Sequence, residues 1–422
     1  MNILVIGSGG REHAICSAFA RSKYQPKIYC ANGNAGIAAI AECVPVRPDD
    51  VKALADLAAA KAVDLTFVGG ETALALGIAD EFESRGLQII GPCREAAQLE
   101  ASKAFAKDFM GRHGIPTARY ATAHSPDFAI EMLESGDFGD ASRSVVVKAD
   151  GLAAGKGVTV AGDRAEAAAA INDLAASGGP AAAKIIIEEC LAGTEVSLLA
   201  FVDGEDFALM PAARDHKRIG NGDTGPNTGG MGTFTDASLL TAEQIGDIAE
   251  RILKPTLHGC IREGMRYRGV LFLGLMMTAA GPMLLEYNVR FGDPETQSIL
   301  VRLETDLVDI CGAMLNGSLS SIEIEWRKGS SACVVLAAEG YPGKPRTGDV
   351  ITGLPDAATM PNVTLFHAAT SRNAAGEYCT AGGRVLGVTA VGDTLSNAVS
   401  TAYGAAGKIA WQGMQYRSDI GK

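Results

Sequence analysis

The chain has 422 residues, 47% of them hydrophobic, and this length predicts about three domains. A formal net charge of −12 argues against a protein that binds nucleic acid through a basic surface, and no apolar run approaches the ~18 residues that a membrane span requires. The nine cysteines are scattered without a C-x-x-C pair, which is typical of reduced thiols. We therefore expect a soluble, cytoplasmic protein that acts on small molecules.

Strands and helices alternate over the first 90 residues. Apolar segments predict strands at 3–6, 27–30, 64–68 and 88–90. The segments between them predict helices at 12–22, 49–62 and 72–84. This alternation is typical of a doubly wound parallel sheet, so we expect an N-terminal domain at 1–100.

A helical pattern at 95–112 leads to a break at 114–116 that suits a hinge. Beyond it, residues 117–192 predict a small α/β unit. Its expected elements are strands at 144–148, 157–161 and 184–188 and an alanine-rich helix at 165–176. Strands at 195–202 and 207–212 follow, and the glycine-rich stretch 215–233 predicts a long functional loop.

The last part of the chain predicts a helix at 242–262 and an antiparallel strand pair at 269–278 and 283–288. A helix at 306–315 and a small mixed unit at 331–410, ending in a helix at 394–408, complete the pattern. We therefore expect a central domain at 101–325, with its small subdomain at about 117–192, and a C-terminal domain at 326–422.

The most informative motif is Lys-Ala-Asp-Gly-Leu-Ala-Ala-Gly-Lys-Gly at 148–157, directly after an apolar run. A lysine at a strand end supplies positive charge, and glycines let backbone N–H groups approach a phosphate. The common phosphate loop G-x-x-x-x-G-K-[ST] does not fit, because Gly151 and Gly155 are one residue too close and Gly157 follows Lys156. The motif therefore predicts phosphate binding on another scaffold.

A second glycine-rich turn, Gly-Ser-Gly-Gly-Arg-Glu-His at 7–13, follows the first strand. The dinucleotide motif G-x-G-x-x-G requires glycine where Glu12 stands, which disfavours NAD. The turn is either a phosphate site with Arg11 as counter-charge or a plain turn between strand and helix.

Acidic residues end the apolar strand at 184–188. Glu188 and Glu195 are either solvated carboxylates or part of a nucleotide site, where backbone groups bind adenine and a carboxylate accepts ribose hydroxyls.

Polar side chains also interrupt the segment 284–295. Strand periodicity places Glu286, Asn288 and Arg290 on one face. Oxygen ligands from Glu and Asn suit Mg²⁺, and an arginine can clamp a carboxylate or phosphate. The alternative is an edge strand with polar residues facing solvent.

The loop at 215–233 carries Asp-His-Lys-Arg at 215–218 and many glycines. It could close over a substrate or lie on the surface as a solvated loop. His216 has no partner at metal-ligand spacing, and no G-x-S-x-G motif supports nucleophilic hydrolysis.

Together these motifs resemble the ATP-grasp superfamily and, within it, the phosphoribosylamine–glycine ligase family. The resemblance runs the whole length, with motifs at 7–13, 33–36, 148–157, 215–218, 225–232, 288–295, 340–343, 382–386 and 419–421. It implies an α/β fold with an N-terminal doubly wound parallel sheet, an ATP-grasp domain with a small mobile lid, and a small mixed C-terminal domain. It also implies a ligase of purine biosynthesis that uses ATP and Mg²⁺ or Mn²⁺ to join glycine to 5-phosphoribosylamine through a glycyl phosphate.

The resemblance also implies site residues. For ATP they are Lys103, Lys148, Gly151, Gly155, Lys156, Gly157, Glu188, Leu191 and Glu195. For the metal they are Glu286 and Asn288. For glycine they are Arg290, through its carboxylate, and Asp215, through its ammonium; with Lys148 these are the expected catalytic residues. For the remaining substrate contacts they are Gly9, Gly10, Arg11, Asn34 and Asn227.

Three positions depart from the usual family pattern. Gly70 replaces a proline before Glu71, Asn32 replaces a proline before Gly33, and Tyr287 stands where phenylalanine is commoner. Tyr287 should point away from the metal ligands, so only the geometry of the phosphoribosylamine site is affected.

Other functions remain as alternatives: another ATP-grasp carboxylate–amine ligase of purine synthesis, an NAD-dependent oxidoreductase, or an inactive nucleotide-binding regulator. The short chain after 419–421 favours a monofunctional enzyme. We expect a monomer or weak homodimer without nucleic-acid or membrane partners.

Overall fold

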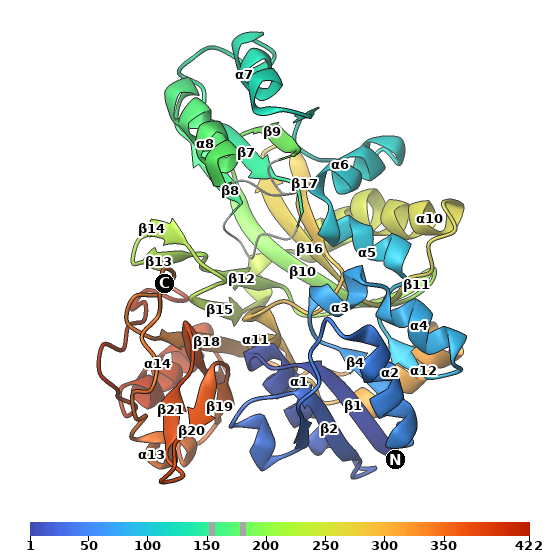
Figure 1. Cartoon of the computed structure of the whole chain (residues 1–422), viewed down its shortest axis with the longest axis vertical. Helices are drawn as coiled ribbons and strands as arrows, with labels where there is room; N and C mark the ends of the chain where they lie inside the picture. The colour runs from blue at the N-terminus through green and yellow to red at the C-terminus, as the bar shows by residue number, and fades with distance from the viewer. Residues whose placement is uncertain (152–156, 178–182) are drawn as a thin grey trace.

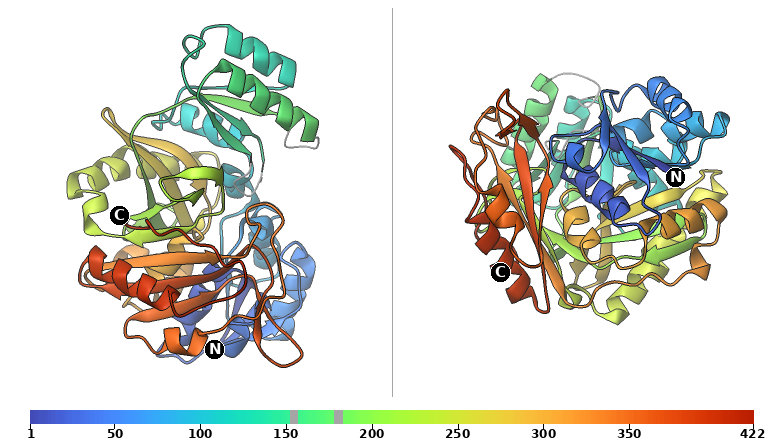
Figure 2. Two further views of the ribbon diagram at one scale, coloured as in Figure 1. Left: turned by 90° about the vertical axis from the view of Figure 1, so that its left-hand side faces the viewer. Right: turned by 90° about the horizontal axis from the view of Figure 1, so that it is seen from below.

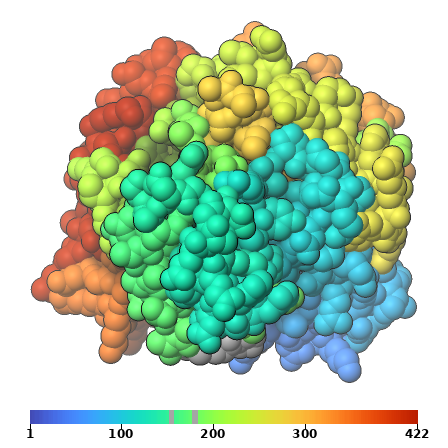
Figure 3. Space-filling view, turned by 90° about the horizontal axis from the view of Figure 1, so that it is seen from above, coloured from blue at the N-terminus to red at the C-terminus, as the bar shows by residue number. Residues whose placement is uncertain are grey.

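The computed structural model describes residues 1–151, 157–177 and 183–422. The N-terminal sheet and the C-terminal part of the chain lie side by side, and a small subdomain with α7 and α8 projects from the opposite end of the molecule (Figure 1). Seen from above, this subdomain forms the uppermost layer (Figure 3). Within the described residues, no helix is long and apolar enough to cross a membrane.

The N-terminal domain is a parallel sheet, as the alternating pattern predicts. Its strand order is β3-β2-β1-β4-β5 and all pairs are parallel. The strands are β1 (Asn2–Gly7), β2 (Lys27–Asn32), β3 (Glu42–Val44), β4 (Leu65–Val68) and β5 (Ile89–Ile90). The helices are α1 (Gly10–Ala20), α2 (Val51–Ala60), α3 (Glu71–Ala75) and α4 (Ile78–Ser84).

Two predicted helices are each divided. The helix expected at 72–84 is α3 and α4, because Gly77 between them has φ +86°, a left-handed conformation that a helix cannot continue through. The helix expected at 95–112 is α5 (Arg94–Ala101) and α6 (Lys103–Arg112). Ser102 between them is extended, and its side chain caps α6 by accepting from the N–H of Phe105.

A large sheet forms the centre of the molecule. Its strand order is β17-β16-β10-β12-β15-β18-β22-β19, with β11 paired to β10. The strands from the central domain are β10 (Thr194–Asp203), β11 (Asp206–Leu209), β12 (Ala213–Asp215), β15 (Gly232–Thr235), β16 (Arg268–Thr278) and β17 (Gly281–Asn288). The predicted antiparallel pairing of the two long apolar strands, β16 and β17, is confirmed.

The prediction of a long loop at 215–233 is wrong. This stretch contains the end of β12, the hairpin of β13 (Arg218–Gly220) and β14 (Thr224–Asn227), and the start of β15. Strand pairing uses only backbone N–H and C=O groups, so a polar, glycine-rich segment can form a hairpin without an apolar pattern.

Several helices cover the large sheet or connect its strands. The helix predicted at 242–262 is α9 (Ala242–Ile248) and α10 (Lys254–Arg262), joined by a π-helical turn at Ala249–Leu253. α12 (Leu307–Asn316) matches its prediction, whereas the short α11 (Glu295–Leu300) gave no periodic signal in the sequence.

The small subdomain is a four-stranded antiparallel sheet with the order β6-β9-β7-β8. Its strands are β6 (Tyr120–Ala123), β7 (Val145–Ala149), β8 (Val158–Ala161) and β9 (Ile185–Glu189). Two helices, α7 (Pro126–Glu134) and α8 (Arg164–Ser177), lie together on its outer face (Figure 2). Val147 and Ile187 pack under these helices, so strand alternation places Lys148 and Glu188 on the opposite face.

The C-terminal part continues the large sheet. Its strands are β18 (Ser330–Ala337), β19 (Val363–His367) and β22 (Arg384–Gly392), with the small pair β20 (Thr370–Arg372) and β21 (Tyr378–Thr380) beside them. Its helices are α13 (Leu354–Ala358) and α14 (Leu395–Ala406). Because β15 pairs with β18, the central and C-terminal parts share one sheet, and side chains from both can meet at that junction.

Candidate functional site

The expected metal ligands lie on β17, the edge strand of the large sheet. Glu286 pairs with Gly274 and Asn288 with Phe272, and both ligand side chains are partly exposed. A Cβ at Gly274 would lie only 3.0 Å from Cγ of Glu286, so the glycine leaves room for this side chain. Tyr287 between them is 2% exposed and its hydroxyl pairs with Thr256, so it points away as predicted.

Three lysines act electrostatically on the carboxylate of Glu286, and Nζ of Lys217 lies 3.9 Å from its Oε1. Burial alone would raise the pKa of Glu286, but Lys217, Lys148 and Lys103 lower it below its ordinary value. The group is therefore ionised at neutral pH. An ionised carboxylate and an amide oxygen on one strand are the hard oxygen donors that Mg²⁺ prefers, so these residues fit the metal.

The expected phosphate lysines come from α6 and from the small subdomain. Lys103, at the start of α6, donates to the carbonyl of Gly151 at 2.8 Å, and Lys148 is the penultimate residue of β7, on the inner face of the subdomain. Gly151 has φ +91°, and the carbonyl of Gly157 accepts from Ala149, so these two glycines form the base of the loop. The other two loop residues of the prediction, Gly155 and Lys156, lie outside the described residues.

Glu188 does not present a free carboxylate to a nucleotide. Its oxygens lie 2.8 Å from Nζ of Lys148 and 3.0 Å from Nζ of Lys107, and its side chain is 2% exposed. Leu191 follows β9 and is half-buried. Any adenine contact at this segment therefore falls to its backbone. Lys107 was not among the predicted site residues, although its position one turn after Lys103 on α6 could have indicated it.

Glu195 also has a cationic partner in this structure. Its Oε2 lies 3.0 Å from Nζ of Lys217, which is itself 3.9 Å from Oε1 of Glu286. Burial would lower the pKa of Lys217, but Glu195, Glu286 and Asp215 together raise it above its usual range. Lys217 was missed by the sequence reasoning, even though the motif Asp-His-Lys-Arg contains it.

Arg290 connects the central domain to the N-terminal domain. The strand β17 ends at Asn288, so strand periodicity does not extend to Arg290 as we expected. Its guanidinium lies 2.6 Å from Glu100 and 3.3 Å from Glu71. Burial raises the pKa of Glu100 to about 6 although Arg290 opposes this, whereas for Glu71 the arginines overcome burial and lower the pKa to about 2.

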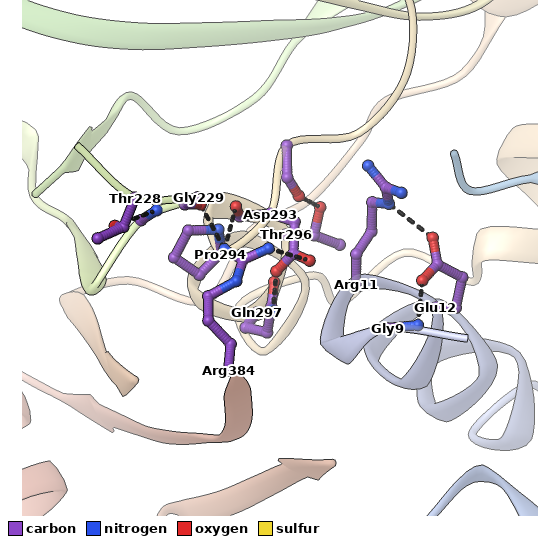
Figure 4. Close-up of polar contacts among 12 residues, drawn as sticks. Gly9, Arg11, Glu12, Thr228, Gly229, Asp293, Pro294, Thr296, Gln297 and Arg384 are labelled. Carbon is purple, nitrogen blue, oxygen red and sulfur yellow. Dashed lines mark hydrogen bonds and ion pairs between the residues drawn. The ribbon is translucent and has the colours of Figure 1, made fainter. Parts of the chain in front are cut away.

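Within the turn at 7–13, the carboxylate of Glu12 accepts hydrogen bonds from other residues of the same turn (Figure 4). Glu12 accepts from the N–H of Gly9 at 2.6 Å and from Nε of Arg11 at 2.7 Å, and it is 2% exposed. A Cβ at Gly69 would lie 2.2 Å from Oε1 of Glu12. Glu12 therefore occupies the N–H group that a dinucleotide phosphate would need, which gives a physical reason against the NAD alternative.

A second polar cluster joins the C-terminal part to the central domain (Figure 4). Arg384 donates to Oδ2 and to the backbone carbonyl of Asp293 at 2.8 and 2.7 Å, and also to the carbonyl of Gly229. The N–H of Gly229 donates to the hydroxyl of Tyr341 at 2.9 Å, and Gln297 donates to Oδ1 of Asp293 at 2.7 Å. The C-terminal part thus fixes the loop of Gly229 and the turn after β17, a role that the motif at 382–386 alone did not reveal.

The remaining predicted substrate residues lie around these two clusters. A Cβ at Gly10 would lie 2.7 Å from Nε2 of Gln297, so the start of α1 packs against α11. The amide of Asn34 makes four internal hydrogen bonds, two of them with Ser8 and His367 as acceptors. Asn227, in β14, lines a cavity of about 530 Å³ between the small subdomain and the C-terminal part. Their substrate contacts stay predictions.

Asp215 is a partly buried acid that lies close enough to the buried Glu295 for their charges to interact. Burial and the neighbouring Glu295 raise the pKa of Asp215 well above its usual range, although Lys217 and Arg384 oppose this. Its Oδ1 accepts from the N–H of His216 at 2.7 Å. A bound cation would relieve the repulsion between the two acids.

Two buried histidines connect the N-terminal and C-terminal parts. The N–H of His367, in β19, donates to Nδ1 of His13, in α1, at 2.8 Å. Burial lowers the pKa of His13 to about 3 and that of His367 to about 4, against an ordinary value of 6.5. Both rings are therefore neutral in the folded protein, and the stability that this provides is present above pH 6.5 and lost as the pH falls.

We expect His13→Asn to weaken the acid dependence of stability. Asparagine keeps an acceptor for the N–H of His367 but cannot titrate. Below its unfolded pKa each histidine should lower the free energy of unfolding by about 1.4 kcal/mol per pH unit, so the slope between about pH 6 and pH 4.5 should be smaller in the variant by this amount. Urea unfolding at several pH values measures the slope, and an unchanged slope would contradict the assignment.

The fold and these residues define an ATP-grasp enzyme. Family models of Phosphoribosylglycinamide synthetase match the chain in order: the N domain at residues 1–100, the ATP-grasp (A) domain at 101–296 and the C domain at 331–422. The chain belongs to this family, the phosphoribosylamine–glycine ligases, and the resemblance found in the motifs is confirmed.

Named relatives and solved structures agree with this family. The chain is 47% identical to the phosphoribosylamine–glycine ligases of Xanthomonas axonopodis pv. citri and Pseudomonas aeruginosa, each alignment covering 100% of this chain and 97% of the relative. A crystal structure of the Thermotoga maritima phosphoribosylamine–glycine ligase matches with a TM-score of 0.84 and 35% identity over 100% of both chains. The biotin carboxylase domain of Hydrogenobacter thermophilus 2-oxoglutarate carboxylase, solved with MgADP and bicarbonate, shares the fold at a TM-score of 0.74 and 16% identity, covering 98% of this chain and 91% of that one.

Proposed function

We propose that the chain uses ATP to join glycine to 5-phosphoribosylamine, giving glycinamide ribonucleotide, ADP and phosphate in purine biosynthesis. The observation that carries the proposal is the pair Glu286 and Asn288 on β17, with Nζ of Lys217 at 3.9 Å from Glu286 and the charges of Lys148 and Lys103 also acting on that carboxylate. Three cations that act on an oxygen-ligand pair suit a nucleotide triphosphate and its metal. Family membership identifies the reaction as glycine ligation.

The proposed chemistry needs positioning and charge stabilisation rather than a protein nucleophile. A carboxylate is a poor acyl donor, so the glycine carboxylate first attacks the γ-phosphate of ATP to form glycyl phosphate and ADP. The amine of phosphoribosylamine then attacks the carbonyl carbon and phosphate leaves. Lys103 and Lys148 hold the phosphate oxygens and offset the charge that develops on them.

For ATP we propose contacts from the loop of Gly151 and Gly157 to the phosphates, from the segment of Glu188 and Leu191 to adenine, and from Glu195 to the ribose. Glu195 would have to leave Lys217 to reach the ribose, and its side chain is 49% exposed, which leaves it free to move. Glu286 and Asn288 would hold Mg²⁺ or Mn²⁺. The metal supplies a positive charge that neutralises the transferring phosphate.

For glycine we propose Arg290 and Asp215. The guanidinium of Arg290 can bind the carboxylate, and the raised pKa of Asp215 marks a partly buried acid that an ammonium group would compensate. For phosphoribosylamine we propose Gly9, Gly10, Arg11, Asn34 and Asn227, which border the junction of the N-terminal, central and C-terminal parts.

The domain division at 1–100, 101–325 (with the lid at about 117–192) and 326–422 is part of the proposal, as is a cytoplasmic enzyme that is a monomer or weak homodimer. So is the absence of nucleic-acid and membrane partners.

An ADP-release assay tests the function. We expect turnover only when ATP, glycine and phosphoribosylamine are present together, with glycinamide ribonucleotide as the product by mass spectrometry. Turnover with bicarbonate or formate in place of glycine would indicate a different ATP-grasp enzyme, and the absence of any turnover would indicate an inactive nucleotide-binding protein. Either result overturns the proposal.

A further inference from the structure

A buried network of charged side chains connects the lid subdomain to the central domain. Glu188 of β9 lies between Lys148 of β7 and Lys107 of α6, with one carboxylate oxygen near each lysine, at 2.8 and 3.0 Å. The side chains of Glu188 and Lys107 are each 2% exposed, and that of Lys148 is 9% exposed. Two cations therefore share one anion in a setting nearly free of water.

Lys107 has a second contact that leads to the metal-binding strand. Its Nζ donates to Oγ1 of Thr117 at 2.7 Å, and this hydroxyl donates to the carbonyl of Leu284 at 2.6 Å. Thr117 lies where the chain leaves α6 and enters the lid, and Leu284 is on β17, two residues before Glu286. Lys107 thus contacts the lid on one side and, through one hydroxyl, the strand of Glu286 on the other.

We propose that Lys107 is a positioning residue for nucleotide binding, which holds Lys148 through Glu188 at a fixed place relative to the strand of Glu286 and Asn288. This inference rests on the proposed function, because it takes Lys148 to be a ligand of the nucleotide phosphates. Lys107 itself is too deeply buried to touch the nucleotide, so it acts through Lys148.

The charges explain why a second lysine is needed. A carboxylate paired with Lys148 alone would neutralise that lysine, and in a poorly hydrated site such a pair is hard to separate. Because Lys107 shares Glu188, the three groups keep a net positive charge. This charge is carried at Lys148, on the inner face of the small subdomain. Burial lowers the pKa of Lys107 to about 8 although Glu188 opposes this, so Lys107 remains a cation at neutral pH.

A double-mutant cycle on the full chain tests the inference. The affinity for MgADP is measured by calorimetry for the unmutated protein, Lys107→Met, Lys148→Met and the double variant. We expect each single change to weaken MgADP binding by about tenfold or more, the loss of one hydrogen bond to a charged group. In the Lys148→Met background, Lys107→Met should weaken MgADP binding further by less than about twofold, because Lys107 acts only through Lys148.

Lys254→Met is the matched control. Lys254 is a lysine on α10 that pairs with Glu250 on the protein surface, and its removal should leave MgADP affinity unchanged. Three results would overturn the inference: a folded Lys107→Met with unchanged affinity, a loss from Lys107→Met that is equally large in the Lys148→Met background, or a Lys148→Met variant that binds MgADP normally.

If Lys107→Met does not fold, Thr117→Val takes its place in the double-mutant cycle with Lys148→Met. It removes the hydroxyl between Lys107 and Leu284 while keeping the shape of the side chain. We expect about a threefold loss of MgADP affinity in the unmutated background and none with Lys148→Met, since Lys107 keeps its ion pair with Glu188 and loses only its link to Leu284. Equal losses in both backgrounds would contradict the inference.

The assay also separates this inference from the proposed function. MgADP binding requires neither glycine nor phosphoribosylamine. A protein that shows the expected cycle but no glycine-dependent turnover would overturn the proposed function and leave the role of Lys107 standing.

Discussion

Glu286→Gln should lower the turnover of ATP with glycine and phosphoribosylamine by about 10³-fold, or about 4 kcal/mol of transition-state stabilisation, while leaving the fold intact. The amide keeps the size of the side chain but removes the negative charge that a divalent cation requires. The positive charges of Lys217, Lys148 and Lys103 would also lose the attraction of this carboxylate. Turnover is measured across a range of Mg²⁺ concentrations, and a thermal melt confirms folding.

Glu195→Gln is the matched control for this prediction. Nζ of Lys217 lies 3.0 Å from Oε2 of Glu195 and 3.9 Å from Oε1 of Glu286. Only Glu286 lies on the same strand as Asn288. If the loss in Glu286→Gln came from disturbing Lys217, Glu195→Gln should cause an equal loss. We expect Glu195→Gln instead to raise the KM for ATP by about tenfold with a smaller effect on kcat, as for the loss of a charged hydrogen bond to the ribose. Equal losses of kcat would contradict the metal assignment.

The parallel N-terminal sheet could be predicted because four of its five strands and the helices between them each have their own pattern, whereas β3 (Glu42–Val44) has only three residues and was not predicted. Alternating apolar strands and amphipathic helices permit few topologies, and the order β3-β2-β1-β4-β5 is one of them. The helix breaks at Gly77 and Ser102 were not predicted, because the apolar periodicity of the sequence continues across both residues. The hairpin of β13 and β14 was not predicted because its pairing uses backbone groups and leaves no apolar pattern.

The site could be predicted only as a set of residue types. The motifs contain Glu286, Asn288, Lys148 and Arg290, but they do not say which acid pairs with which base. Arg290 pairs with Glu71 and Glu100, which precede it by 219 and 190 positions in the numbering of the chain. Such partners are set by how the N-terminal and central domains meet, and local sequence carries no record of that geometry.

The pairing of Glu188 illustrates the same limit. A strand ending in acids is compatible with solvated carboxylates or with a nucleotide site, and the structure shows a third arrangement in which the carboxylate binds two lysines. Lys107 lies 81 residues before Glu188, on α6 and outside the small subdomain that contains Glu188. The signal for this contact was the spacing of Lys103 and Lys107, which indicates a shared helix face but no partner.

Arg290→Met should abolish glycine-dependent turnover and lower the free energy of unfolding by about 3–5 kcal/mol. Arg290 is the cation nearest to Glu100, whose side chain is 7% exposed and whose other contact is the N–H of Val289 at 2.8 Å. Removing the guanidinium therefore leaves a buried carboxylate without a counter-charge. Urea unfolding measures the stability, and ADP release at saturating ATP measures the activity.

The double variant Arg290→Met with Glu100→Gln separates these two effects. Glutamine keeps an acceptor for the N–H of Val289 and removes the buried charge, so most of the lost stability should return. Turnover should stay absent, because no guanidinium remains to bind the glycine carboxylate. Arg251→Met, which removes an exposed arginine paired with Asp247, should change neither measurement. If the double variant regains turnover, Arg290 serves only to neutralise Glu100, and the glycine carboxylate must bind to another cation, of which Lys217 has the strongest electrostatic effect on Asp215.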